Sequence, residues 1–123
     1  MIDAKWAREF AREWIAAWNA HDLERILSHY TDDFEMRSPL IAEGMGVPSG
    51  TLKGKAAIRP YWERALAASP PPCFEFLDVM VGASAIALHY WSVSRGKYVI
   101  EVLTLNERRE VVSGSAFYGE PTR

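Results

Sequence analysis

One acidic residue of the chain lies in a segment where carboxyl groups are rare. Glu101 is the only charged residue in the run V-I-E-V-L-T-L at positions 99–105. Strand periodicity places it on one face together with Val99, Leu103 and Leu105. The opposite face is apolar as well, which is typical of a central strand, so we expect the Glu101 carboxyl group to point into an apolar layer.

A carboxyl group in such a layer must find a partner, become protonated or face a cavity. Desolvation raises the pKa of a buried carboxyl group by up to about 3–5 units, which prepares it for general acid or base chemistry at neutral pH. A structural ion pair within the sheet is the alternative, with Arg37, Arg95 or His89 as the cation. The residues alone leave both interpretations open.

Other residue types that support catalysis or metal binding form no comparable pattern. The three histidines are scattered, and none has a second histidine four residues away. The single cysteine, Cys73, excludes an internal disulfide and a cysteine-based zinc site. Asp32, Asp33 and Glu35 could bind a divalent cation, but acidic residues at a helix-to-strand turn are mostly solvated surface. We therefore expect no metal site and no cofactor.

Charge and hydropathy limit the classes of partner. Fourteen Lys and Arg against sixteen Asp and Glu give a net charge of −2, whereas nucleic-acid binding needs a basic surplus. The longest uncharged stretch, 79–94, is too short to span a bilayer, and the charged N-terminus has no signal-peptide core. We expect one domain over residues 1–123, cytoplasmic, that binds neither nucleic acid nor membrane.

The first half of the chain predicts three helices. Residues 3–20 carry apolar side chains every four positions and charged ones between them, as in an amphipathic helix. Asp22 is a suitable N-cap for a second, short helix. A third helix is expected over 55–68. Pro60 lies past its first turn, so the regular helix either starts nearer Ile58 or is kinked. The connecting segments are expected to be a turn at 31–33, a strand at 34–38 and a glycine-rich loop at 44–54.

The second half predicts a meander of four strands, at 74–81, 85–94, 97–106 and 111–118. Helices followed by strands indicate an α+β fold in which the helices pack on one face of a curved sheet. The strands between 74 and 106 are apolar on both faces. A second copy of the chain is the simplest cover for the outer face, so we expect a homodimer.

Several short segments also follow a known order. They are WIAAWNAHDL at 14–23, YTDDF at 30–34, GKAAI at 54–58 with YW at 61–62, and VVS and FYGE at 111–113 and 117–120. In this order they resemble the nuclear transport factor 2-like superfamily, which includes the ketosteroid isomerases and the SnoaL-like polyketide cyclases. The resemblance covers nearly the whole chain. It implies a cone of three helices over a curved, mixed, mainly antiparallel sheet, with a pocket open at one end.

The resemblance to the ketosteroid isomerases implies positions for a site. The oxyanion-binding tyrosine of that family falls on Trp14, which offers only an indole N–H. Its general-base aspartate falls on Ser38, which cannot take a proton at neutral pH. Its protonated carboxylic acid falls on Glu101. Ordinary ketosteroid isomerase chemistry is therefore not expected, and Glu101 is the one catalytic candidate.

The implied fold also predicts the pocket walls. The wall residues share inward-facing strand positions or a place at the top of the cone, and they are Phe34, Met36, Ser38, Ala116, Tyr118, Tyr30 and Tyr61. Trp14 joins them from the first helix. For each aromatic residue, packing in the core is the alternative role.

These observations predict a pocket protein for a small, apolar organic molecule. As an enzyme it would carry out isomerisation, cyclisation, dehydration or hydrolysis without a cofactor. Glu101 would move the proton, while Trp14, Ser38 and Tyr118 would orient a polar substrate atom. The alternatives are a ligand-binding module without turnover and a dimerisation or interaction domain.

Overall fold

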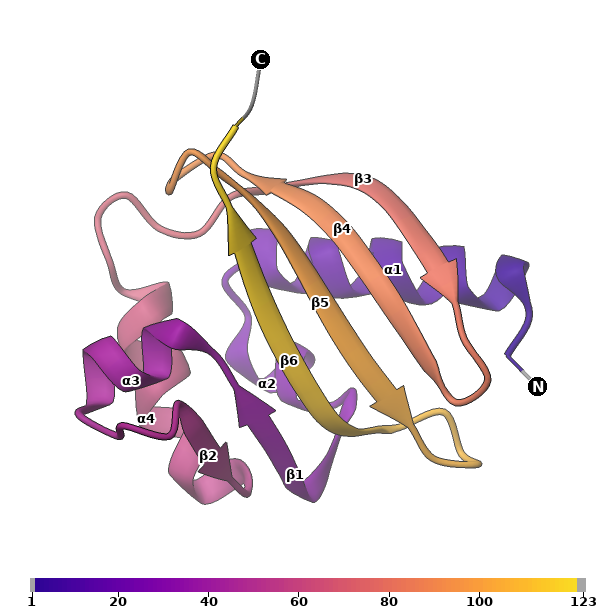
Figure 1. Cartoon of the computed structure of the whole chain (residues 1–123), viewed down its shortest axis with the longest axis horizontal. Helices are drawn as coiled ribbons and strands as arrows, with labels where there is room; N and C mark the ends of the chain where they lie inside the picture. The colour runs from indigo at the N-terminus through magenta and orange to yellow at the C-terminus, as the bar shows by residue number, and fades with distance from the viewer. Residues whose placement is uncertain (1, 122–123) are drawn as a thin grey trace.

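The computed structural model describes residues 2–121, and its helices and strands form an α+β fold (Figure 1). The three expected helices correspond to α1, α2 and α4, and a short additional helix, α3, follows the first strand. In chain order the elements are α1 (Ala4–Asn19), α2 (Leu23–Leu27), β1 (Tyr30–Arg37), α3 (Pro39–Met45), β2 (Thr51–Lys53), α4 (Lys55–Leu66), β3 (Phe74–Val81), β4 (Ala85–Ser92), β5 (Lys97–Leu105) and β6 (Val111–Gly119).

One twisted sheet contains all six of these strands, in the order β2-β1-β6-β5-β4-β3. The meander predicted for β3 to β6 is confirmed, because each consecutive pair is antiparallel. The first strand joins the far side of the meander, where β1 runs parallel to β6. The sheet is therefore mixed and mainly antiparallel, and α1 lies against its inner face (Figure 1).

The first strand begins earlier than the sequence suggests. Residues 31–33 were expected to form a turn, but they belong to β1, and the pairing of β1 with β6 is irregular between Tyr30 and Glu35. The irregularity lets Tyr30 and Phe34 both be buried while Asp32 and Asp33 remain exposed. Acidic residues in this segment therefore mark a bulged strand and not its end.

The expected loop at 44–54 is shorter in the structure, because its first two residues belong to α3 and residues 51–53 form β2. The Ser38 side chain accepts a hydrogen bond from the Leu40 N–H and caps α3, and Pro39 occupies its first turn. The helix ends at Gly46, whose φ of 65° is easily adopted only by glycine. Residues 51–53 then form β2, which pairs with β1. Local capping signals outweigh the glycine content here.

Helices α1 and α4 supply the side of the core opposite the sheet. The Asp3 carboxylate caps α1 by accepting from the Trp6 N–H at 2.8 Å, and the buried stripe of α1 includes Trp14 and Trp18. Helix α4 begins at Lys55 and continues through Pro60, with Trp62 buried. Trp18 and Trp62 meet edge to face, with their ring centroids 5.2 Å apart. The aromatic residues therefore join the two helices.

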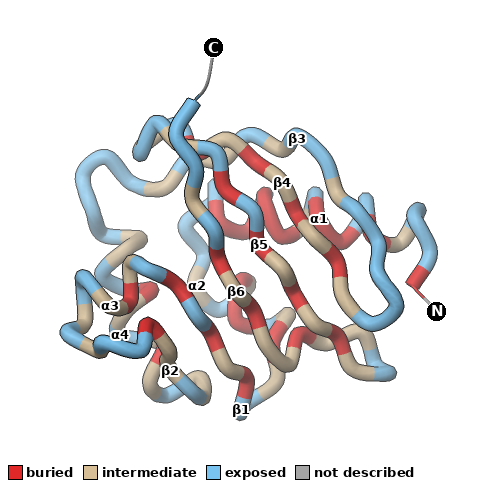
Figure 2. Tube along the Cα trace, viewed as in Figure 1, coloured by how far each residue is buried: buried red, intermediate tan, exposed pale blue. Residues whose placement is uncertain are grey.

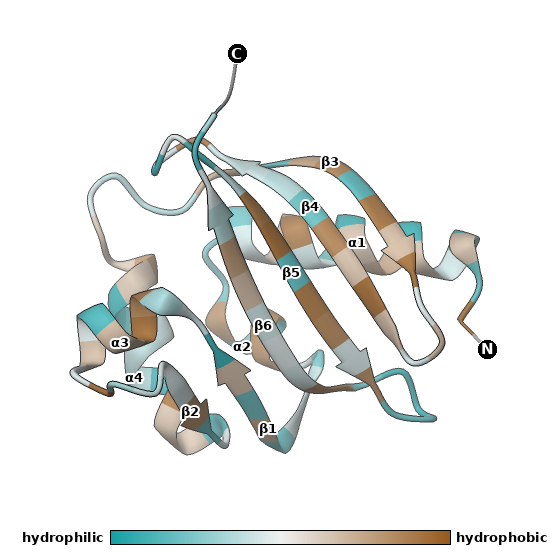
Figure 3. Ribbon diagram, viewed as in Figure 1, coloured by the Kyte–Doolittle hydropathy of each residue, from teal (hydrophilic) through white to brown (hydrophobic). Residues whose placement is uncertain are grey.

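The alternation predicted for β5 is confirmed. Val99, Glu101 and Leu103 are buried, whereas Tyr98 and Ile100 are exposed on the opposite face (Figure 2). The outer face points toward the viewer in Figures 1 to 3, and β4 and β5 contain many apolar residues (Figure 3). Within residues 2–121, no helix has the length and apolar character that a membrane span requires.

Candidate functional site

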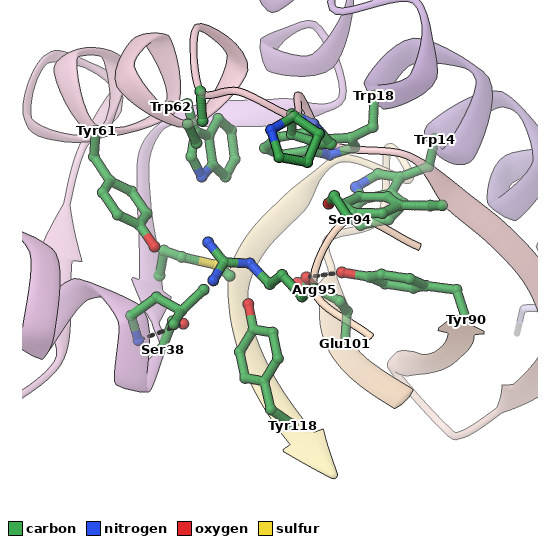
Figure 4. Close-up of a pocket in the computed structure, with 17 residues that line it drawn as sticks. Trp14, Trp18, Ser38, Tyr61, Trp62, Tyr90, Ser94, Arg95, Glu101 and Tyr118 are labelled. Atoms are coloured by element: carbon green, nitrogen blue, oxygen red, sulfur yellow. Dashed lines mark hydrogen bonds between the residues drawn. The ribbon is translucent and has the colours of Figure 1, made fainter. Parts of the chain in front are cut away.

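A cavity of about 260 Å³ lies between α1, α4 and the inner face of the sheet (Figure 4). Drug-sized ligands occupy roughly 300–1,000 Å³, so this cavity has room for a smaller organic molecule. Aromatic side chains of the two helices form one side, and polar groups from β5, β6 and the β4–β5 turn face them. The lining residues are Trp14, Trp18, Met36, Ser38, Leu40, Tyr61, Trp62, Ala65, Ala68, Pro70, Pro72, Phe74, Tyr90, Ser94, Arg95, Glu101 and Tyr118.

The carboxyl group of Glu101 is part of the cavity wall and is nearly inaccessible to solvent, with 6% of the residue exposed. Its Oε2 accepts a hydrogen bond of 2.9 Å from the Tyr90 hydroxyl. Its Oε1 is buried and has no hydrogen-bond partner among the described residues. Burial raises the pKa of Glu101 to about 7, although the Tyr90 hydrogen bond acts in the opposite direction. At neutral pH the group therefore exists in both protonation states.

The alternative of an ion pair for Glu101 is not what the structure contains. Arg37 instead pairs with Glu35, at 2.8 Å. His89 alternates with the inward-facing residues of β4, so it is on the outer face, where it packs beside Tyr98. The side chain that holds Glu101 is an uncharged hydroxyl, that of Tyr90.

Sequence analysis did not single out Tyr90. The residue before Tyr90 on β4 pairs with Ile100, which faces outward. Tyr90 therefore faces inward and is a diagonal neighbour of Glu101 on β5. Burial, followed by the charge of Glu101, raises the pKa of Tyr90 well above its ordinary value. Tyr90 is therefore a neutral donor that positions the carboxyl group.

Three hydroxyl groups gather at the other end of the cavity (Figure 4). Burial raises the pKa of Tyr118 and of Tyr61, and hydrogen bonding to Ser38 offsets part of the rise for each. Both tyrosines are therefore neutral near pH 7 and serve as hydrogen-bond donors. Ser38 is 5% exposed, and its hydroxyl oxygen also caps α3.

The indole N–H of Trp14 is already used within the core. It donates to the Tyr30 hydroxyl at 2.9 Å, and both residues are buried. Trp14 therefore contributes its ring face to the cavity, and its N–H has no free hydrogen for the oxyanion role that the resemblance implied. Trp18 and Trp62 add two more ring walls that were not named as site residues in advance.

Six of the predicted site residues come together around the cavity, namely Trp14, Met36, Ser38, Tyr61, Glu101 and Tyr118. Tyr30, Phe34 and Ala116 do not line it. Tyr30 and Phe34 pack against each other in the core, with ring centroids 4.4 Å apart. Ala116 lies directly opposite Glu101 on β6.

The cavity lining offers one carboxylate and no histidine, lysine, aspartate or cysteine. No group of three or more His, Cys, Asp or Glu side chains is arranged to hold a metal ion anywhere in residues 2–121. Glu101 is therefore the one lining side chain that can exchange a proton near pH 7.

Replacing Tyr90 with phenylalanine should raise the pKa of Glu101 above about 7, because the Tyr90 hydrogen bond stabilises the charged carboxylate. A ¹³C NMR titration of the glutamate carboxyl carbons measures this pKa. Tyr98→Phe, which removes an exposed hydroxyl on the outer face, is the matched control and should leave the titration unchanged. An unaltered midpoint in Tyr90→Phe would show that the hydroxyl does not hold the carboxylate.

Helices packed on one face of a mixed, mainly antiparallel sheet around this cavity define the nuclear transport factor 2-like fold. More closely, the chain belongs to the SnoaL-like domain family, whose model matches residues 11–118. A SnoaL-like protein of unknown function from Burkholderia thailandensis is 44% identical in sequence, with a TM-score of 0.92. That alignment covers 96% of this chain and 98% of the other.

More distant solved structures share the fold. An NTF2-like protein of unknown function from Burkholderia xenovorans has 17% identity and a TM-score of 0.74, over 95% of this chain and 85% of its own. The epoxide hydrolase/cyclase-like enzyme SalBIII, with a role in pyran ring formation in the polyether salinomycin, has 18% identity and a TM-score of 0.74. That match covers 97% of this chain and 95% of SalBIII. A comparison with curated proteins finds no match.

Proposed function

We propose that this chain is a cofactor-independent enzyme that moves a proton within a small organic molecule bound in the cavity. One observation carries the proposal. Glu101 is held by Tyr90 through one carboxyl oxygen, and its other oxygen is unpartnered in the wall of the cavity. A pKa of about 7 lets that carboxyl group take up and release a proton at neutral pH.

The number of titratable groups favours a particular type of reaction. Hydrolysis and dehydration commonly need an acid and a base at once, but Glu101 is the single group of this kind in the lining. An isomerisation, or a cyclisation that begins with an enolate, needs one group that removes a proton from carbon and later returns it. Among the four reactions expected from the sequence, these two fit the cavity best.

The neutral hydroxyls supply the second element of such a reaction. When carboxylate Glu101 removes a proton from a carbon next to a carbonyl, the electron pair moves to the carbonyl oxygen and forms an enolate. Tyr61 and Tyr118 are neutral donors whose hydroxyls point toward the cavity (Figure 4). Donors of this kind stabilise the developing negative charge. In an isomerisation, protonated Glu101 returns its proton to another carbon of the enolate. In a cyclisation, the enolate carbon attacks a second carbonyl group of the ligand, and the proton goes to the alkoxide oxygen that this forms.

Exchange of carbon-bound protons in D₂O tests the proposal without knowledge of the natural substrate. The probes are cyclohex-3-enone, 2-indanone and 2-tetralone, which differ in size and all carry acidic protons beside a carbonyl. We expect the protein at pH 7.5 to accelerate exchange in at least one of them, as followed by ¹H NMR. Uncatalysed rates for all three would contradict proton-transfer catalysis.

A ligand-binding module without turnover is the second candidate. The absence of a second acid or base in the lining favours it, because a protein that only holds its ligand needs no proton relay. Calorimetric binding of a ketone without proton exchange would distinguish this function from catalysis.

We also propose that the chain forms a homodimer through the outer face of the sheet. Four large apolar side chains are exposed there, namely Met80, Tyr98, Ile100 and Phe117, with exposed fractions between 41% and 65%. The strand register places Phe117 directly opposite Ile100, with Tyr98 two residues from Ile100 on β5, and Met80 lies across Ala87 of β4. Clustered apolar side chains on the surface of a small protein are typical of an interface.

A further inference from the structure

We propose that the ligand of the cavity is an amphiphilic carboxylate, with its anionic group bound by Arg95 at the mouth and its apolar body inside. This inference rests on the proposed function and deepens it, because the sequence predicted only a small, apolar ligand. It is carried by the placement of Arg95, by a second hollow beside the cavity, and by unpartnered polar atoms in the cavity wall.

Arg95 belongs to the turn between β4 and β5, and its side chain reaches across the mouth of the cavity (Figure 4). The guanidinium group lies between the hydroxyls of Tyr61 and Tyr118 in Figure 4, and its charge offsets part of the rise in pKa that burial causes in both. No hydrogen bond or ion pair joins it to another residue in 2–121. A cation without a partner at the mouth forms a site for an anion.

A second hollow, of about 350 Å³, lies between α3 and α4. Arg95 and Tyr61 line both spaces, so the two are adjacent. The outer hollow also contains Arg64, which donates to the Gly44 carbonyl, and the carboxylate of Glu43. Two arginines and one glutamate leave a single net positive charge there. That charge balances a monoanion such as a carboxylate and not a doubly charged phosphate.

The inner part of the cavity suits an apolar body with one or two polar atoms. The rings of Trp14, Trp62 and Phe74 form its walls. Two buried polar atoms of lining residues have no partner within residues 2–121, namely Glu101 Oε1 and the indole N–H of Trp18. Buried polar groups are costly when unpaired, so a ligand with a hydrogen-bonding group in its body would stabilise both the complex and the wall.

The geometry assigns Glu101 and Arg95 different tasks. Glu101 faces the body of the ligand, where a proton is moved, and Arg95 fixes the end of the ligand that stays at the mouth. Anchoring through a remote charge orients the reacting carbon, which is how positioning groups contribute to catalysis. Arg95 is therefore a positioning residue in this proposal and takes no part in proton transfer.

Matched ligand pairs test the inference by isothermal titration calorimetry at pH 7.5. Each pair is a carboxylate and its uncharged primary amide: cyclohexaneacetate and cyclohexaneacetamide, phenylacetate and phenylacetamide, 1-naphthylacetate and 1-naphthylacetamide. We expect at least one carboxylate to bind ten times more tightly than its amide. Arg95→Gln should remove most of that tenfold preference and change binding of the amide by less than twofold.

Arg12→Gln is the matched control, because it removes the same charge from an exposed position on α1 that does not line either hollow. It should leave the preference intact. Raising the salt concentration should weaken carboxylate binding to the unaltered protein and not amide binding. Circular dichroism confirms that both variants are folded.

Each of the other outcomes contradicts the inference or a specific part of it. Equal affinity for acid and amide would overturn the inference and leave the proposed function standing, with a neutral ligand. A preference for acids that survives in Arg95→Gln would overturn the role of Arg95. Failure of every pair to bind would overturn the inference, and proton exchange in the ketone probes would then show whether the proposed function stands independently.

Discussion

Glu101→Gln should lose between about a hundredfold and ten-thousandfold of the proton-exchange activity, the usual contribution of a general acid–base group. Glutamine keeps the shape of the side chain and can still accept a hydrogen bond from Tyr90, but it cannot take up a proton. The cavity should therefore retain its form. Ligand affinity should change far less than turnover, which separates a chemical role from a structural one.

The same substitution should change how stability depends on pH. The folded protein holds the Glu101 proton with a pKa of about 7, and the ordinary value is 4.5. A group with a raised pKa stabilises the folded state fully below the ordinary value and loses that contribution as pH rises to the folded value. From these two pKa values, the wild-type protein should lose about 3 kcal/mol of stability between pH 4.5 and pH 7 because of this group.

Glutamine has no such titration, so the variant should gain on the wild type as pH rises. We expect Glu101→Gln to be more stable than the wild type at pH 8 and close to it at pH 5, in urea unfolding at both values. All other groups titrate equally in the two proteins, so the difference isolates Glu101. Glu107→Gln, on the exposed β5–β6 turn, is the matched control. A variant much less stable at pH 8 would contradict a carboxyl group that is buried without a cation.

The β-meander shows why much of the fold was predictable from the sequence. Turn residues separate four runs of strand-forming residues, and the boundaries of β3 agree with the prediction at both ends. The inward direction of Glu101 followed from period-two alternation, which needs no knowledge of neighbouring strands. The resemblance then supplied what alternation cannot, that the sheet is mixed; the structure shows that the parallel pair is β1 with β6.

The contacts of the site were harder to predict, because they depend on register and on turn geometry. The turn between β4 and β5 pairs Ser92 with Lys97 and so sets the register of the two strands. Tyr90 contacts Glu101 because of this register. Arg95 lies in that turn, and nothing in its own sequence position indicates that the side chain reaches over the cavity mouth. Strand alternation predicts which face of the sheet a side chain is on. Which side chains it contacts depends on the register between neighbouring strands.

Alternation also does not predict whether an inward-facing side chain lines the cavity or is buried in the core. Phe34 and Met36 face inward from β1, and Ser38 directly follows its end, but only Met36 and Ser38 line the cavity. Phe34 is fully buried beneath the ring of Trp62, with their centroids 5.7 Å apart. Inward-facing residues at one end of a strand therefore fill the core, and those at the other end form the cavity wall.

Phe117→Asp should convert the proposed dimer into a monomer at micromolar concentration. Phe117 is 56% exposed at the outer face of β6, opposite Ile100 on β5. Burying a phenylalanine contributes roughly 1.5–3 kcal/mol. In a two-fold symmetric interface each substitution occurs twice, so the loss is about 3–6 kcal/mol. At about 1.4 kcal/mol for each tenfold change, the dissociation constant should rise at least a hundredfold.

Sedimentation velocity over a range of concentrations measures this change. The wild-type protein should sediment as a dimer, and Phe117→Asp as a monomer with an unchanged circular dichroism spectrum. Ala4→Asp is the control, since it adds the same charge at an exposed position in the first turn of α1, where the helix dipole favours an acidic residue. Ala4→Asp should remain dimeric. A wild-type protein that is monomeric at 100 μM would contradict the interface, and the cavity would then function within a single chain, because all its lining residues come from one copy.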